Sequence, residues 1–156
     1  MIRRAVPDVQ ALVQGVLSRS GPAGALLESW ERRETEIVTC EEIVSTFEAV
    51  LKRPHIQRKF AHLAGEAIVT FTAGLREQTV FVSPDEIPRI VPFDPDDDIV
   101  LACAVAGHAD YVISRDRHLL VLGSYQGIPI VSTEAFARIL RGQVSESLEF
   151  VYGRRG

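Results

Sequence analysis

The chain has 156 residues, enough for one ordinary domain with its own core, and its 46% hydrophobic and 24% charged content is typical of a soluble globular protein. A net charge of −4 argues against binding nucleic acid through bulk positive charge, although a nuclease whose acidic cluster binds cations stays possible. Because no apolar run approaches the roughly 20 residues of a membrane span, and no apolar core follows the first basic residues, we expect neither a membrane segment nor a signal peptide.

The first half of the chain alternates between strand and helix patterns. Residues 2–7 form an apolar run that predicts a strand ending at Asp8. Apolar side chains at helical spacing then predict a helix over 9–19, and a second helix over 23–33 follows the break Ser20-Gly21-Pro22. The next predicted elements are a strand at 36–39, a helix at 40–53, a helical stretch from His55 to about Gln78, and a strand at 79–82.

The second half continues this alternation after a loop at 83–95. It predicts a helix at 97–107, a strand at 111–114, a short helix at 116–122, a strand at 128–131 and a last helix at 132–140. Alternating strands and helices favour a parallel sheet covered on both faces. We expect one domain over residues 1–140 and a tail over 141–156, whose apolar stretch 148–152 could be an edge strand, a packing arm or a partner contact.

Two cysteines, Cys40 and Cys103, lie far apart in the sequence, each among apolar residues. We therefore expect buried free thiols rather than a disulfide or metal ligands. This use of cysteine agrees with a location in the cytoplasm.

Acidic residues follow or precede several of the predicted strands. Asp8 ends the first strand, Asp116 follows the fourth, and Asp97 belongs to the acidic run 94–98 that opens a helix. Ligands of open parallel sheets bind beyond the carboxyl ends of the strands, so these carboxylates should converge. Converging carboxylates repel one another, and a hard cation such as Mg²⁺ or Mn²⁺ removes that repulsion. Such ions activate water for attack on a phosphodiester.

Each of these acids also has a purely structural interpretation. Aspartate favours N-caps and first helical turns, so Asp94, Asp96 and Asp97 could simply cap the helix that they precede, and Asp116 the short helix after it. Asp8 could be a turn residue, and Asp110 is better explained as a turn or structural acid. The conjunction of several acids at one sheet edge is stronger evidence than any one of them.

Several segments together resemble the PIN-domain family, and within it the toxin components of bacterial toxin–antitoxin pairs. The specific part is 94–98 (Asp-Pro-Asp-Asp-Asp) with 109–116 (Ala-Asp-Tyr-Val-Ile-Ser-Arg-Asp) and Leu119-Leu120, and 127–132 fits the last strand of the family. Weaker matches are 20–23 and 50–54 in the first half. The resemblance covers roughly residues 2–140.

The resemblance implies a three-layer α/β/α sandwich with a five-stranded parallel sheet. It also implies Mg²⁺- or Mn²⁺-dependent cleavage of RNA, with Asp8, Asp97 and Asp116 as metal ligands and catalytic acids. The serine or threonine that the family carries before its last acid falls on Ser114, which we count with the catalytic residues. The family further implies an RNA substrate, a cognate antitoxin and a homodimer.

The chain departs from the family pattern at two places. Val9-Gln10 follows the first acid where the family has Thr-Asn, and Thr46 occupies the position of a family glutamate. Glu42 lies one helical turn earlier on the same face and could compensate, whereas Glu48 points elsewhere. We therefore expect weakened or altered metal binding. The alternative is a catalytically degenerate PIN-like module that binds RNA or a protein partner.

Other classes fit the sequence less well. No lysine follows Lys59, although a response-regulator receiver needs one after its last strand, and the glycine motifs of P-loop and dinucleotide-binding proteins are absent. The histidines show no zinc-ligand spacing. Arg53, Arg115 and Arg117 could bind phosphates or be ordinary surface charges. Single-stranded or looped RNA is the expected substrate, because A-form duplex hides its base edges.

Overall fold

A computed structural model describes residues 2–63, 65–85, 87 and 95–142 of the chain. Among these residues the strands form one six-stranded sheet in the order β3-β2-β1-β4-β6-β5, with β5 antiparallel to β6 and the other pairs parallel. The strands are β1 (Arg3–Pro7), β2 (Thr35–Thr39), β3 (Val80–Phe81), β4 (Tyr111–Ser114), β5 (Ser124–Tyr125) and β6 (Ile128–Ser132).

The sequence predicts a five-stranded parallel sheet, and the structure has one strand more. Five strands are parallel as predicted, and β5 adds an antiparallel edge. Gln126 and Gly127 make this hairpin, both with positive φ (49° and 79°), which is the conformation that a two-residue hairpin turn requires. A strand of two residues has no detectable periodicity, so the sequence pattern could not reveal it.

The helices follow the predicted pattern with one exception. They are α1 (Val9–Leu17), α2 (Pro22–Glu31), α3 (Glu41–Leu51), α4 (Pro54–Lys59), α5 (Gly65–Glu77), α6 (Pro95–Ala106), α7 (Arg117–Leu122) and α8 (Thr133–Leu140). The single helical stretch expected from His55 to Gln78 is wrong, because α4 ends at Lys59 and α5 begins at Gly65. The turn between them lets Leu63 enter the core, where it is 5% exposed.

Both faces of the sheet are buried, as a three-layer sandwich requires. Successive residues of β1 alternate: Ala5 packs with residues of α2 and α8, and Val6 packs with residues of α3, α5, α6 and α7. On β4, Ile113 and Val112 divide between the same two clusters. The strands β4 and β6 are accordingly apolar along most of their length, as expected for strands covered on both faces.

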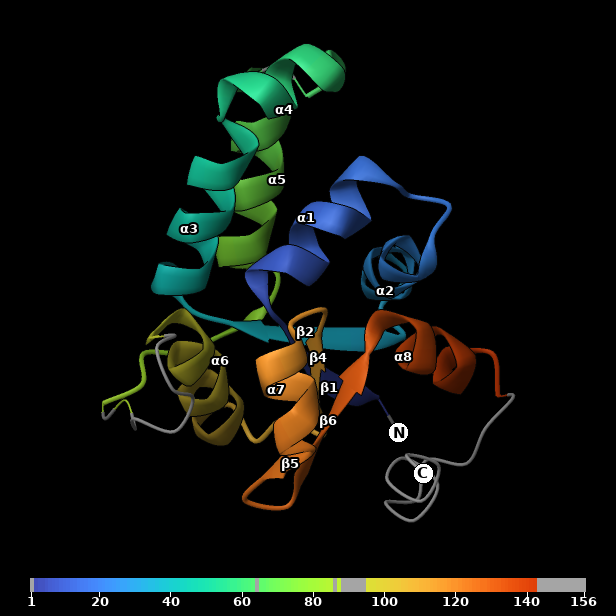
Figure 1. Cartoon of the computed structure of the whole chain (residues 1–156), viewed down its shortest axis with the longest axis vertical. Coiled ribbons are helices and arrows are strands. Elements are labelled where there is room, and N and C mark those ends of the chain that lie inside the picture. Colours follow the sequence, from blue (N-terminus) through green and yellow to red (C-terminus); the bar gives the residue numbers. More distant parts are fainter. Residues whose placement is uncertain (1, 64, 86, 88–94, 143–156) are drawn as a thin grey trace.

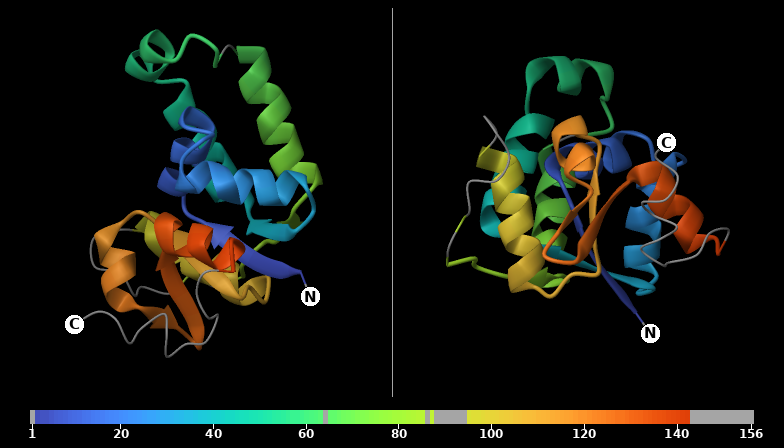
Figure 2. Two further views of the ribbon diagram at one scale, coloured as in Figure 1. Left: turned by 90° about the vertical axis from the view of Figure 1, so that its right-hand side faces the viewer. Right: turned by 60° about the horizontal axis from the view of Figure 1, so that its bottom comes forward.

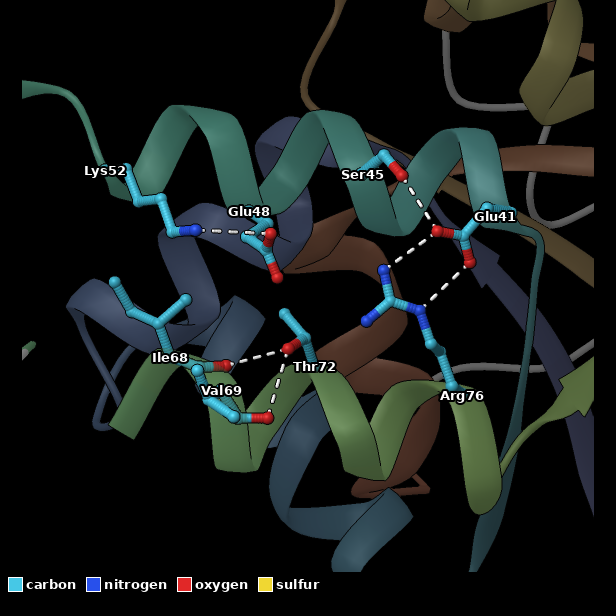
Figure 3. A network of polar contacts seen from close by, with 8 residues as sticks. All are labelled: Glu41, Ser45, Glu48, Lys52, Ile68, Val69, Thr72 and Arg76. Carbon is cyan, nitrogen blue, oxygen red and sulfur yellow. Dashed lines mark hydrogen bonds and ion pairs between the residues drawn. The ribbon is translucent and has the colours of Figure 1, made fainter. Parts of the chain in front are cut away.

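Helices α3, α4 and α5 project together from one side of the sheet as an arm (Figures 1 and 2). Polar contacts join α3 to α5 along the arm (Figure 3): Arg76 donates two hydrogen bonds of 2.9 Å to Glu41, which also accepts one of 2.9 Å from Ser45. The same two helices also meet through aromatic rings: the centroids of Phe47 on α3 and Phe71 on α5 lie 5.5 Å apart. Because the ion pair is exposed, apolar packing contributes most to holding the arm together.

The cysteine prediction is confirmed, since Cys40 and Cys103 are free and fully buried. They contact each other between the start of α3 and the middle of α6, and the hydrogen bond from Cys103 lowers the pKa of the Cys40 thiol. Among the described residues no helix is long and apolar enough to cross a bilayer. The predicted tail from 143 onward, including 148–152, and most of the loop 83–95 lie outside the described residues.

Candidate functional site

Asp8 lies at the carboxyl end of β1, in the centre of the sheet. Its backbone N–H donates to the carbonyl of Ile113 at 2.9 Å, which continues the ladder between β1 and β4. Its carboxylate is 4% exposed and makes three hydrogen bonds. Oδ1 accepts from the N–H of Ala11 (2.7 Å), and Oδ2 accepts from the Ser114 hydroxyl (2.5 Å) and the N–H of Arg115 (3.3 Å). Asp8 is thus the N-cap of α1 and is held rigidly.

The environment of Asp8 disfavours its negative charge. Burial raises the pKa of this carboxyl, the nearby charge of Asp116 adds to that effect, and the hydrogen bonds from Ser114, Ala11 and Arg115 only partly oppose it. A cation beside Asp8 would lower its pKa again, because it would compensate for the water that burial removes.

Ser114 and Asp116 follow β4 next to Asp8. The fully buried Ser114 hydroxyl donates to Asp8 and accepts from the N–H of Asp116 at 2.8 Å, so it links the two acids. Asp116 is the N-cap of α7, where Oδ1 accepts from the N–H of His118 at 2.7 Å. The capping interpretation of Asp116 is therefore correct, and Asp8, which the sequence pattern also allowed as a turn residue, caps a helix as well. Neither cap excludes a second role for its carboxylate.

Asp97 belongs to the first turn of α6, which packs under β1 and β2. It is 6% exposed, whereas its neighbour Asp96 is exposed. Asp94 lies outside the described residues. Asp110 has the structural role expected for it: Oδ2 accepts from the N–H of Arg4 (2.9 Å), and its own N–H donates to the carbonyl of Arg4 (2.7 Å).

A cavity of about 420 Å³ brings the predicted site acids together. Asp8, Asp97 and Asp116, which come from three separate segments, all line it. Its other described lining residues are Val9, Gln10, Val13, Gln14, Thr46, Val50, Arg53, Asp96, Val100 and Arg115. A larger cavity of about 800 Å³ lies along the other side of α6, where Asp85 is the one acid among its described lining residues, so it is a weaker candidate.

The positions where the chain departs from the resemblance also face this cavity. Thr46 lines it, as does Val9. Neither Glu42 nor Glu48 is among its described lining residues. Glu42 interacts with the thiol of Cys40, and Glu48 pairs with Lys52 at 3.3 Å. The idea that Glu42 compensates for Thr46 therefore has no support from the geometry.

Two of the three arginines that the sequence pattern marked, and two glutamines, are among the described residues that line the cavity with the acids. Arg53 and Arg115 line the cavity and could contact phosphate, whereas Arg117 is not among its described lining residues. Gln10 and Gln14 on α1 also line the cavity; the sequence pattern marked Gln10 only as a departure from the family and did not mark Gln14. The sequence does indicate that these two glutamines share one helix face, because they lie four residues apart on the helix that follows Asp8.

The donor set suits a hard divalent cation, although it is not a finished metal site. Three carboxylates around one cavity are the oxygen ligands that Mg²⁺ and Mn²⁺ prefer, and the buried charge of Asp8 is the kind that a cation stabilises. Among the described residues, no three or more histidine, cysteine, aspartate or glutamate side chains lie close enough together to hold an ion as they stand. Thr46 contributes no charge where a fourth acid was expected.

Comparison with known proteins identifies the family. No curated protein matches the chain significantly. Residues 4–118 match the family model of the PIN domain, a stretch that contains Asp8, Asp97, Ser114 and Asp116. PIN domains are generally nucleases, and they typically use divalent metals. With most of its length covered by this match and a sheet of the corresponding α/β/α type, the chain belongs to the PIN-domain family.

Proposed function

We propose that this protein is a divalent-metal-dependent endoribonuclease that acts as the toxin of a toxin–antitoxin pair. The observation that supports the proposal most directly is the cavity onto which Asp8, Asp97 and Asp116 converge from three parts of the chain. These carboxylates would hold Mg²⁺ or Mn²⁺. When bound, such an ion activates water and stabilises the charge on a phosphodiester under in-line attack.

The chain's own residues would position the reactants. Ser114 and the N–H of Arg115 hold the Asp8 carboxylate through Oδ2, so this ligand does not have to be ordered during the reaction. The same serine fixes the N–H of Asp116 and so the start of α7. Arg53 and Arg115 at the cavity wall would bind phosphates on either side of the cleaved bond.

The experiment that tests the nuclease is Mn²⁺ titration by calorimetry followed by cleavage of a labelled RNA pool, with wild type and Asp97→Asn compared. Glu66→Gln, an exposed acid at the start of α5, is the matched control. We expect binding and cleavage in wild type and the control, and loss of both in Asp97→Asn. A folded wild type that binds no Mn²⁺ at millimolar concentration would contradict the proposal and leave a non-catalytic module that binds RNA or a protein.

The toxin assignment adds partners that can be tested separately. We propose a cytoplasmic protein that forms a homodimer and is inhibited by a cognate antitoxin, which places a basic residue among the cavity acids. Expression of wild type should arrest bacterial growth, and Asp97→Asn should not. Sedimentation of the purified chain measures the oligomeric state, and a monomer at all concentrations would contradict the homodimer.

A further inference from the structure

The cavity that holds the carboxylates also has an uncharged side. Helix α1 contributes Val9, Gln10, Val13 and Gln14, and α3 adds Val50. No residue of α1 from Val9 to Leu17 carries a charge, whereas α6 and the loop after β4 contribute acids to the cavity. One cavity thus combines a charged region with a neutral wall of amides and branched apolar side chains.

Close packing fixes which face of α1 meets the cavity. A Cβ added at Gly15 would lie 2.9 Å from Leu27 Cδ1 and 3.0 Å from the carbonyl oxygen of Ala23, so α1 and α2 approach as closely as a glycine allows. Ala11 and Leu12 on this side of α1 are fully buried. The helix therefore cannot rotate, and its cavity face is preorganised.

The two amides on that face are not used by the fold. Within the described part of the chain, neither the Gln10 nor the Gln14 side chain makes a hydrogen bond to another residue. Each amide offers two N–H donors and one carbonyl acceptor. Spaced four residues apart, they lie side by side, with the half-buried Val13 and Val50 as apolar neighbours.

We propose that Gln10, Val13, Gln14 and Val50 form a subsite for an unpaired nucleobase of the RNA, next to the phosphate that is cleaved. This inference rests on the proposed nuclease function and specifies its substrate recognition. A base combines apolar faces with an edge of donors and acceptors, which matches valines beside amides. Glutamine amides read base edges, and a cavity of about 420 Å³ is in the size range of small-ligand sites.

The neighbouring charges agree with this arrangement. The base would lie between α1 and α3, Arg53 follows the end of α3, and Arg115 lies beside Asp8 at the start of α1. Phosphates attached to the bound nucleotide can therefore reach an arginine while its base stays on the neutral wall. A single-stranded or looped nucleotide can turn its base into such a cavity without the cost of unpairing it from a duplex.

The test measures base preference rather than activity alone. A pool of labelled RNAs with randomised positions is cleaved by wild type, and the products are sequenced. We expect a preference of about tenfold or more for one base at one position beside the cut. The double variant Gln10→Leu with Gln14→Leu keeps side-chain size but removes the amides, and its preference should fall to about twofold or less. Gln78→Leu, an exposed glutamine after α5, is the control and should keep the wild-type preference.

Two results would overturn the subsite: a wild type without base preference, or a preference that the double variant retains. If no RNA is cleaved, by wild type or by the variant, binding decides. Fluorescence anisotropy with four labelled pentanucleotides in EDTA compares affinities without catalysis. Discrimination among bases that is lost in the double variant supports the subsite even where the nuclease proposal fails, and equal affinity of wild type for all four oligonucleotides contradicts it.

Discussion

The Ser114 hydroxyl is the buried link between the two acids that follow the central strands, and its removal gives a quantitative test of the site. In Ser114→Ala, Asp8 loses a hydrogen bond of 2.5 Å, and the N–H of Asp116 loses its acceptor at 2.8 Å. A hydrogen bond to a charged group contributes about 1.5–3 kcal/mol, and a neutral one about 1 kcal/mol. Because the N–H of Arg115 still reaches Asp8, we expect a loss of about 2–3 kcal/mol in the free energy of unfolding at neutral pH.

The pH dependence of this loss distinguishes the charged hydrogen bond from simple packing. Burial raises the pKa of Asp8, and the Ser114 hydrogen bond opposes that effect, so the substitution raises the pKa further. A group with a raised folded-state pKa destabilises the fold increasingly as pH rises through that pKa. The difference between wild type and Ser114→Ala should therefore be largest at neutral pH and shrink on acidification.

The assay is urea unfolding followed by circular dichroism over a range of pH. Ser45→Ala is a matched control, because Ser45 also donates to a carboxylate, that of Glu41, at 2.9 Å, but on an exposed helix surface. It should change the free energy of unfolding by no more than about 0.5 kcal/mol. If Ser114→Ala is as mild as the control, or if its effect is independent of pH, the reasoning about Asp8 is refuted.

Three further predictions follow from the same geometry. Asp8→Asn should increase stability at neutral pH, since the raised pKa of Asp8 shows that the fold disfavours its charge, and the gain should vanish on acidification, as urea unfolding measures. Thr46→Glu should tighten Mn²⁺ binding by about tenfold or more in calorimetry, and an unchanged affinity would contradict a role for this position. Gly24→Ala should lower the free energy of unfolding by about 1–3 kcal/mol, because the added Cβ would lie 2.0 Å from the carbonyl oxygen of Arg19. Gly65→Ala is the control: a Cβ there meets nothing within 4 Å, so thermal unfolding should show no such loss.

The sequence predicted the acidic side of the site because topology determines it. Strands β1 and β4 are parallel neighbours in the centre of the sheet, so the residues that follow them lie together at the carboxyl end of the sheet. Asp8 and Asp116 are therefore neighbours. Their register confirms this, since Pro7 pairs with Ile113 directly before the two turns. The position of Asp97 followed from the resemblance together with the start of α6.

The uncharged side of the cavity could not be predicted in the same way. Whether Gln10 and Gln14 face the cavity depends on the rotation of α1, which is fixed by the contact of Gly15 with α2. That contact joins residues on different helices, and no local pattern encodes it. The same limit applies to Glu42, which shares a helical face with Thr46 in the sequence pattern but is not among the described residues that line the cavity with Thr46.

The capping and catalytic interpretations of these aspartates are compatible because a carboxylate has two oxygens. In Asp8, Oδ1 caps α1, while Oδ2 receives the Ser114 hydroxyl and faces the loop after β4. In Asp116, capping by Oδ1 fixes the side chain at the cavity wall. A cap orders its carboxylate without neutralising it, and burial beside a second acid makes that ordered charge unfavourable. A cation bound at the carboxyl ends of the two central strands would relieve this destabilisation, so a role as helix cap and the proposed role as metal ligand are compatible in the same carboxylate.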